Sequence, residues 1–502
     1  MANVNASAAS SVRFDFALAT PVNVVTPVSG SSIRFEYQSN APSRVIMNGS
    51  AFVYDNSGAL TAGLVKRVRL DYEFLGTFQA NIDIKNLNVR AEDLFVPGTP
   101  DEQYDAFVSN LLAGDDVFTV GGSFSGMGDF LSVTQGETLT GGNDVISGFS
   151  QTLDQPMAGD AFEVIGGRVN GGNDRITGES DLGGGGDNTF DGDLFLAGET
   201  LTLDGGRVSG GDDIIKSLGG GPLTEMAGSV LDLIAGRVDG GNDRITGSGD
   251  DDKIAGDTFE QTAGRTFGGN DELKGADGVD TLSGDTLTLN AGRVFGGDDI
   301  ILGQSGDDML AGDVYLKTGG KVVGGDDVLK GGAGNDILHG DVFDGREATG
   351  GNDTLRGNGG NDRLYGDKGA DKLFGNGGSD ELYGGGGADV LNGGGGDDAL
   401  DGGAGKDTYR GGAGSDTFVI RVEDSLVGAR DRVLDFTLED TLSIVAPIGI
   451  SAVDQFSGVA GEMQRINAPG SITFLGDFDG DGLADFSLAV TITDGSDGGA
   501  VI

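Results

Sequence analysis

An aspartate that returns every nine residues is the feature that most constrains how this chain can fold. Two residues after each of these aspartates stands a large apolar residue, and glycines come just before most of them, so the unit is Gly-Gly-x-Gly-x-Asp-x-U-x, where U is the apolar residue. A short unit that repeats at a fixed period cannot bury its apolar residue alone and predicts a stack of similar coils. The aspartates of the uninterrupted run are Asp353, Asp362, Asp371, Asp380, Asp389, Asp398, Asp407 and Asp416.

Upstream of this run the same unit stands inside a longer period. Pairs of aspartates nine residues apart recur there, and the pairs themselves return with a 28-residue period. The pairs are Asp243 and Asp252, Asp271 and Asp280, Asp299 and Asp308, and Asp327 and Asp336. A third segment of each block, such as 284–289, alternates like a strand but lacks the second Gly-Gly-x-Gly-x-Asp turn. We interpret the blocks as the nonapeptide array with every third turn modified. Still further upstream the spacing loosens, through Asp116, Asp144, Asp174 and Asp213.

The glycines and aspartates of the repeat predict what holds such coils together. A six-residue turn and a three-residue strand make half a coil, so two repeats make an 18-residue coil with two short parallel sheets facing each other. One apolar side chain per repeat is too thin a core to offset the backbone entropy of ordering nine residues. Glycines permit positive φ, and stacked turns place successive carboxylates about 5 Å apart. Carboxylate and carbonyl oxygens suit Ca²⁺ better than Mg²⁺, which requires a tighter octahedron.

With these residues, the segment from about 113 to 419 resembles the RTX (repeats-in-toxin) proteins. The resemblance implies a parallel β-roll in which calcium ions bridge the aspartates of successive coils. Carried over to this sequence, the ligands are the eight aspartates at steps of nine from Asp353 to Asp416, followed by the paired aspartates from Asp243 to Asp336. The third segment of each 28-residue block departs from the pattern, so the calcium prediction does not extend to it.

Composition divides the chain into three predicted domains within an all-β fold. Residues 1–112 form a β-rich domain, residues 113–419 the roll (28-residue blocks to about 352, then nonapeptides) and residues 420–502 a β cap. Alternating apolar residues predict strands over 32–37, 65–70 and 78–84 in the first domain, and the spacing over 100–112 predicts a short helix. The last domain resembles the C-terminal cap of serralysin-type proteins, and this resemblance implies a secretion signal read by a type I exporter.

An acidic loop in the cap is a second candidate calcium site. Asp477, Asp479, Asp481 and Asp485 occupy positions 1, 3, 5 and 9 of an EF-hand-type loop, with Gly482 at position 6. The bidentate glutamate expected at position 12 is replaced by Leu488. The alternative interpretation is a plain acidic turn between two strands, 472–475 and 486–492.

A column of basic residues accompanies the 28-residue blocks. A base stands six residues before the aspartate in each block: Arg168, Arg207, Arg237, Arg265, Arg293 and Lys321. Stacked coils would place these side chains in a row. They either pair with neighbouring carboxylates as a ladder or remain solvated and only moderate the charge, since exposed ion pairs contribute about 0–1 kcal/mol.

Charge and motifs narrow the function. Eighty acidic and 32 basic residues give a net charge of −48, which repels nucleic acids and anionic membranes and attracts cations. The chain has no cysteine and one histidine, His339, which we place at the end of a strand beside the roll. No His-Glu-x-x-His or Gly-x-Ser-x-Gly motif is present, and no apolar run reaches the ~18 residues of a membrane helix, so we expect neither an enzyme nor membrane insertion.

These observations predict a secreted calcium-binding protein of the extracellular space or bacterial cell surface. Its expected role is structural or adhesive, in a surface layer, a matrix or a filament, with folding on calcium binding outside the cell. Its expected partners are calcium ions, the type I exporter and either copies of itself or a cell-surface polysaccharide. Two alternatives remain open, a glycan- or surface-binding module in residues 1–112 and an enzyme with a carboxylate site.

Overall fold

In the computed structural model of this protein, the secondary-structure elements of the described residues are β-strands. The structure describes residues 3–7, 23–29, 32–37, 43–54, 60–74, 77–90, 117–121, 132–133, 138–140, 145–150, 155–158, 161–165, 168–170, 173–180, 194–197, 200–218, 224–344, 348–422, 430–446, 449 and 451–493. Every element in these residues is a strand, which confirms the all-β prediction, and none of them is a helix that could span a membrane. The helix predicted over 100–112 lies outside the described residues. The chain divides into two compact units, Met1–Glu272 and Leu273–Ile502.

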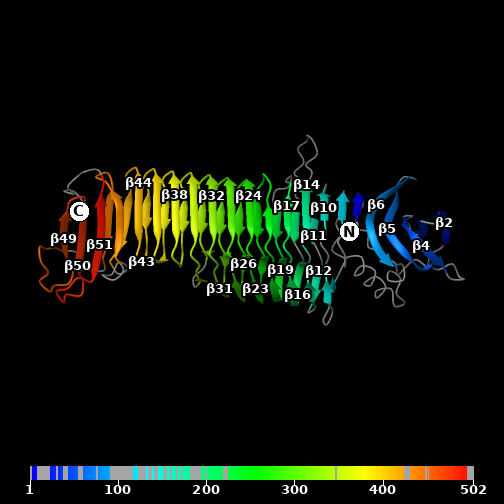
Figure 1. Ribbon diagram of the computed structural model, residues 1–502, viewed down its shortest axis with the longest axis horizontal. Helices are drawn as coiled ribbons and strands as arrows, with labels where there is room; N and C mark the ends of the chain where they lie inside the picture. The colour runs from blue at the N-terminus through cyan, green and yellow to red at the C-terminus, as the bar shows by residue number, and fades with distance from the viewer. Residues whose placement is uncertain are drawn as a thin grey trace. The chain divides into compact units, whose positions relative to one another are not determined.

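The first unit begins with an antiparallel meander, in which each strand pairs with the next. All three strands predicted in residues 1–112 lie in it (Figure 1). β1 (Asn3–Ser7) pairs antiparallel with the meander's last strand and parallel with β7 (Val117–Gly121). The predicted domain boundaries at 112 and 419 stay predictions. The meander strands are β2 (Asn23–Ser29), β3 (Ser32–Tyr37), β4 (Ser43–Tyr54), β5 (Leu60–Phe74) and β6 (Thr77–Arg90).

Beyond β7 the first unit is a parallel roll with three rows of strands, because each strand pairs in register with its counterpart one coil later. The first row continues from β7 through β10 (Val145–Ser150), β14 (Arg175–Ser180), β17 (Ile214–Ser217) and β20 (Arg244–Thr246). The second row is β11 (Gln155–Ala158), β15 (Leu194–Ala197), β18 (Thr224–Ala227) and β21 (Asp252–Ala255). The third row is β8 (Ser132–Val133), β9 (Thr138–Thr140), β12 (Ala161–Ile165), β13 (Arg168–Asn170), β16 (Thr200–Ser209), β19 (Val230–Asp239), β22 (Thr258–Gln261) and β23 (Arg265–Phe267).

The second unit contains coils of three lengths before its cap, because a 26-residue coil from Val328 to Thr354 lies between the 28-residue and the 18-residue coils. Ile300 pairs with Val328 across a 28-residue coil, whereas Thr354 pairs with Lys372 across the 18-residue coil predicted for two nonapeptides. The first row, which follows β24 (Glu272–Asp277), is β28 (Ile300–Ser305), β32 (Val328–Ala333), β36 (Thr354–Gly359), β38 (Lys372–Gly377), β41 (Val390–Gly395) and β44 (Thr408–Ala413). The second row is β25 (Thr281–Ser283), β29 (Met309–Ala311), β33 (Ile337–His339), β37 (Arg363–Tyr365), β39 (Glu381–Tyr383), β42 (Ala399–Asp401) and β45 (Thr417–Arg421).

The third segment of each 28-residue block corrects our interpretation of that block. It is not a modified third turn but an insertion within the first turn of the coil. A Cβ placed on Gly340 would lie 2.3 Å from Oδ2 of Asp353, and one on Gly366 would lie 2.6 Å from Oδ2 of Asp371, so the two glycines begin equivalent turns. The first of these turns runs from Gly340 to Asp353 and is much longer than the second, which runs from Gly366 to Asp371, although both end at a stacked aspartate.

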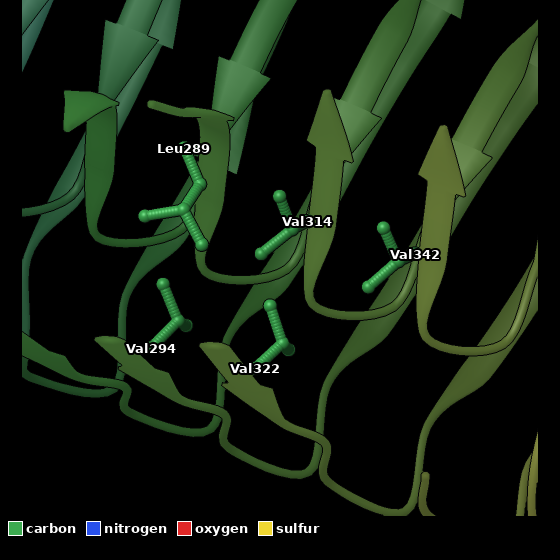
Figure 2. Packing of buried hydrophobic residues seen from close by; sticks show 5 residues of the cluster. All are labelled: Leu289, Val294, Val314, Val322 and Val342. Carbon is green, nitrogen blue, oxygen red and sulfur yellow. The ribbon is translucent and has the colours of Figure 1, made fainter. Parts of the chain in front are cut away.

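The inserted residues form strands of their own in a separate row (Figure 1). In the second unit these strands are β26 (Thr286–Leu289), β27 (Arg293–Phe295), β30 (Val314–Lys317), β31 (Lys321–Val323), β34 (Val342–Asp344) and β35 (Ala348–Thr349). They enclose an apolar cluster of their own, shown in Figure 2, which consists of Leu289, Val294, Val314, Val322 and Val342. The 28-residue coils therefore have more apolar core than the 18-residue coils.

The 18-residue coils are thin. Two short strands, β40 (Gly386–Gly387) and β43 (Ala404–Gly405), replace the inserted row there. The apolar residue of every nonapeptide points inward and is at most 1% exposed, as the repeat predicts. These residues are Leu355, Leu364, Leu373, Leu382, Leu391, Leu400, Tyr409 and Phe418.

The predicted cap closes the last coil of the second unit. β46 (Asp431–Phe436) and β47 (Thr441–Val445) continue the two rows in parallel. β51 (Phe486–Ile492) pairs with β46, and the remaining cap strands are β48 (Ser451–Ala452), β49 (Glu462–Ala468) and β50 (Ser471–Asp477). β49, β50 and β51 form an antiparallel sheet, which covers an edge that would otherwise be open to another chain.

Candidate metal centre

The sixteen repeat aspartates predicted as ligands fall into two sets, one for each turn of the coil. None of them is more than 3% exposed. We call the first set the first-turn aspartates: Asp243, Asp271, Asp299, Asp327, Asp353, Asp371, Asp389 and Asp407. The second-turn aspartates are Asp252, Asp280, Asp308, Asp336, Asp362, Asp380, Asp398 and Asp416. Burial of this many carboxyl groups is costly unless each is paired or coordinated.

In both turns the carboxyl groups form a ladder that runs from coil to coil through one oxygen each, except at Asp252, whose Oδ2 accepts from the N–H of Ser248 in its own turn. The backbone N–H of Asp353 donates to Oδ1 of Asp371 at 2.8 Å, and the N–H of Asp371 donates to Oδ1 of Asp389 at 2.8 Å. The second turn repeats this pattern, since the N–H of Asp362 donates to Oδ1 of Asp380 at 2.8 Å. In the first unit, the N–H of Asp243 donates to Asp271 at 2.7 Å. The ladder fixes the carboxyl groups at the pitch of the strands.

The other oxygen faces a space lined by oxygen atoms. Oδ2 of Asp371, Asp380 and Asp389 is buried and accepts no hydrogen bond. A Cβ placed on Gly375 would lie 2.2 Å from Oδ2 of Asp380 and 2.6 Å from the carbonyl oxygen of Gly393. The glycine leaves this space open, and the carboxylate and a carbonyl of the next coil converge on it.

A second glycine in each turn is needed for close stacking. Gly378 has φ of +132°, and a Cβ there would lie 1.6 Å from the carbonyl oxygen of Gly360 in the preceding coil. A side chain at this position would therefore be strained and would separate the coils.

Burial makes these carboxyl groups resist ionisation. Desolvation is the largest cause, and it raises the pKa of Asp353 to about 9 and that of Asp371 to about 8. The same cause raises the pKa of the second-turn Asp336 and Asp398 to about 7 and that of Asp362 to about 6. A cation among them would reverse this effect by favouring the charged form.

These features fit calcium. Turns such as those of Asp371, Asp380 and Asp389 offer a buried carboxylate oxygen without a hydrogen bond, together with a carbonyl oxygen and a glycine that leaves room. Carboxylate and carbonyl oxygens are the hard donors that Ca²⁺ takes with tolerant geometry. Bound there, the ion would neutralise successive carboxylates and tie neighbouring coils together.

A parallel roll with buried carboxylates at its turns has the architecture of a calcium-binding β-solenoid. The family model of the RTX calcium-binding nonapeptide repeat (4 copies) matches residues 237–259, 266–286, 295–314, 323–345, 347–382 and 383–418. Residues 237–418 are therefore RTX calcium-binding repeats, and the predicted cofactor, Ca²⁺, is the one that these repeats bind. A comparison with curated protein sequences gives no match to this chain.

Some carboxylates with the same placement were not among the predicted ligands. Asp174 and Asp213 extend the first-turn ladder of the first unit, with N–H to Oδ1 distances of 2.6 and 2.7 Å, and the looser spacing upstream had indicated them. Asp431 and Asp440 end the two ladders in the cap, at 2.9 and 3.0 Å. Each follows the last repeat aspartate of its ladder by a 24-residue step, which a period of nine does not predict.

The inserted row brings a further set of buried aspartates, which we call the insertion aspartates: Asp257, Asp285, Asp313 and Asp341. Each is fully buried and follows a glycine. Each also stands at one fixed spacing after a first-turn aspartate, as Asp257 does after Asp243 and Asp313 after Asp299. The 28-residue recurrence of this Gly-Asp pair is a signal that could have identified them.

The acidic loop of the cap connects β50 to β51, and the structure brings part of its predicted set together. Carboxylate oxygens of Asp477, Asp479 and Asp485 lie within 4.8 Å of one another, whereas Asp481 is not in this group and accepts a hydrogen bond from the N–H of Leu483. Asp477 also accepts from the N–H groups of Gly480 and Gly482, as in an acidic turn. Calcium binding by this loop stays a prediction.

The basic residues stack in a row within each unit, as the sequence predicts. Arg207 pairs in register with Arg237 and Arg237 with Arg265, and in the second unit Arg293 pairs with Lys321. Arg207 and Arg237 both form ion pairs with Asp239, which belongs to the inserted row and is not a repeat aspartate. Both bases are about two-fifths exposed, so each ion pair contributes about 0–1 kcal/mol.

His339 lies at the end of β33, as predicted. Its ring stacks on Tyr365 with a centroid distance of 4.2 Å, and its Nδ1 lies 3.3 Å from Oδ2 of Asp367. These contacts give the histidine a packing role at the edge of the roll.

Proposed function

We propose that this protein is exported by a type I system and acts outside the cell as a calcium-dependent structural or adhesive protein. The observation that carries the proposal is the buried ladder of carboxylates, in which Oδ2 of Asp371, Asp380 and Asp389 faces an oxygen-lined space without a hydrogen bond. At low intracellular calcium these carboxylates repel one another and favour an unfolded chain, and extracellular calcium at about 10⁻⁴–10⁻³ M drives folding.

A calcium titration followed by circular dichroism and calorimetry tests the folding step. We expect little β structure in chelator and cooperative folding as calcium rises to about 1 mM. A fold that chelator leaves unchanged contradicts the proposal.

The structural role has its own test, which is self-association or binding to cell surfaces by the folded full chain with calcium present. A structural protein assembles or adheres, and a chain that stays monomeric and binds no surface contradicts this role. The glycan-binding and enzymatic alternatives rest on the sequence alone. A glycan array and an activity screen on proteins, esters and polysaccharides, each probed with the calcium-loaded chain, discriminate them.

A further inference from the structure

The 28-residue coils differ from the 18-residue coils in the carboxylates that face the first turn. The turn starts with a glycine in both, and the next residue in the 18-residue coils is Asp367, Gly385 or Gly403, each with positive φ. The Asp367 side chain is 29% exposed, whereas in the 28-residue coils a fully buried aspartate stands there, such as Asp313 after Gly312. The insertion therefore adds one buried carboxylate per coil beside the first-turn aspartates.

One carboxylate oxygen of Asp313 has no hydrogen-bond partner. Its side chain is fully buried, and its Oδ1 accepts from the N–H of Gly325 at 3.0 Å. Its Oδ2 is buried and accepts no hydrogen bond. None of the ion pairs in the described part of the chain joins Asp313 to a lysine or arginine. A buried carboxylate in this state is costly without a cation.

The insertion aspartates converge with one another and with the first-turn set. In the first unit, oxygens of Asp243, Asp257 and Asp271 all lie within 4.8 Å of one another. In the second unit, a Cβ on Gly324 would lie 2.3 Å from Oδ1 of Asp341 and 2.6 Å from Oδ2 of Asp313. The N–H of Asp299 donates to Oδ1 of Asp327 at 2.7 Å, and a Cβ on Gly312, the residue before Asp313, would lie 2.2 Å from Oδ2 of Asp327.

We propose that the insertion aspartates form a second class of calcium site in the first turns of the 28-residue coils, in which Asp313 binds the ion together with Asp299 and Asp327. The second turns and the 18-residue coils offer one buried carboxylate per turn, whereas these turns offer two. Because affinity for Ca²⁺ rises with the number of charged ligands, the 28-residue coils bind calcium more tightly. The inference rests on calcium binding by the repeats and not on the structural or adhesive role.

The test compares calcium binding by the full chain and its variants, measured by competition calorimetry against a chelator of known affinity. Asp313→Asn keeps the size of the side chain and an oxygen for the N–H of Gly325. We expect it to weaken calcium at the tightest class by about tenfold or more. Asp454→Asn, at an exposed carboxylate in the cap of the same unit, is the charge-matched control and should leave the isotherm unchanged. Asp308→Asn, in the second turn, should affect the weaker class alone.

Stability measurements separate a ligand from a structural carboxylate. Asp313→Asn should lower the melting temperature in calcium and leave it unchanged or raise it in chelator, because it removes an uncompensated buried charge. Equal losses in both conditions, with a wild-type isotherm, would overturn the proposal. Asp341→Asn repeats the test if Asp313→Asn does not fold. If Asp308→Asn also leaves the isotherm unchanged, calcium binding by the ladder itself is wrong.

Discussion

The 28-residue and 18-residue coils of the second unit share their strands but differ in what lies between them. Leu329 in a 28-residue coil and Leu373 in an 18-residue coil are both fully buried, and the first-turn aspartates keep one register through both kinds of coil. Only the 28-residue coils have the inserted strands, with their apolar cluster around Val314 and Val322. The same Gly and Asp positions therefore serve coils with thick and thin cores.

The comparison teaches that the stacked turns, not the amount of apolar core, define the repeat. The coil tolerates an insertion of ten residues because the glycines and the aspartate at the two ends of the turn keep their positions. It adds apolar burial and a buried carboxylate together, so greater stability from packing comes with greater dependence on a cation.

The largest expected effect is the dependence of the calcium-free chain on pH. The folded pKa values of about 6 to 9 lie above the ordinary value of 3.8, so the folded state binds protons more tightly than the unfolded state. Calcium-free stability is then highest below about pH 4 and falls as pH rises towards 9. Thermal unfolding in chelator from pH 4 to pH 9 measures it.

Amide hydrogen exchange in chelator shows which coils cause this pH dependence of stability. The pKa of Asp389 is raised by burial to about 6, whereas burial raises those of Asp313 and Asp327 well above their usual value. Above about pH 7 we therefore expect further loss of protection mainly in the 28-residue coils and at their junction with the 18-residue coils. Stability that rises with pH in chelator contradicts the burial argument.

Glycine substitutions should come next. In an 18-residue coil, Gly387 has φ of +155° and a Cβ there would lie 1.3 Å from the carbonyl oxygen of Gly369, so Gly387→Ala should cost about 3–5 kcal/mol. In a 28-residue coil, Gly325→Ala should cost about 2–3 kcal/mol, because its Cβ would lie 1.6 Å from the carbonyl oxygen of Gly297. Chemical denaturation in calcium measures both.

The neighbouring glycine is the matched control. Gly386 has nothing within 4 Å of an added Cβ, so Gly386→Ala should change stability by less than about 1 kcal/mol. If all three variants are equally stable, the stacked turns are not as close as described.

A change of sign with calcium is expected for the ladder aspartates. Asp371→Asn removes a buried carboxylate whose Oδ2 accepts no hydrogen bond. In calcium this substitution should destabilise the chain by about 2–4 kcal/mol. In chelator at pH 8 it should stabilise the chain, because the amide places no uncompensated charge in the interior. Melting temperatures in the two conditions measure this effect, with Asp454→Asn at an exposed carboxylate of the cap as control. Destabilisation in both conditions would mean that Asp371 acts only through its hydrogen bonds.

The smallest effect is expected for the basic column of the inserted row. Arg237 pairs with Asp239 and lies 4.1 Å from the ring centroid of Phe267, yet its side chain is 44% exposed. Arg237→Ala should cost less than about 1 kcal/mol at ~0.15 M salt. A loss of several kcal/mol in thermal or chemical unfolding would show that the row supports the coils as a ladder.

The sequence predicted most of the 18-residue coils and less of the 28-residue ones. The nine-residue period places Leu373 inside and Asp371 in the turn because the coil repeats the unit without interruption. The period alone does not say where the extra ten residues of a 28-residue block leave the coil. That choice depends on stacking contacts between coils, such as the one between Gly351 and Gly369.

The missed ligand candidates have the same cause. Asp313 follows Gly312 but is not preceded by a complete Gly-Gly-x-Gly-x-Asp turn in the sequence. The insertion separates it from Gly325, whose N–H donates to Asp313 in the fold. In the cap, the position of Asp481 outside its acidic group depends on the local hydrogen bonds of the loop. Ligand spacing along the chain identifies a metal loop but not which oxygens converge.

The most direct test of the account is anomalous diffraction from crystals of the calcium-loaded protein, at a resolution that resolves single ions. The account predicts peaks between the turns of successive coils, each beside a repeat aspartate, with the insertion aspartates facing ions in the 28-residue coils. Intact coils with no ion at these turns, in crystals grown with calcium, would contradict it.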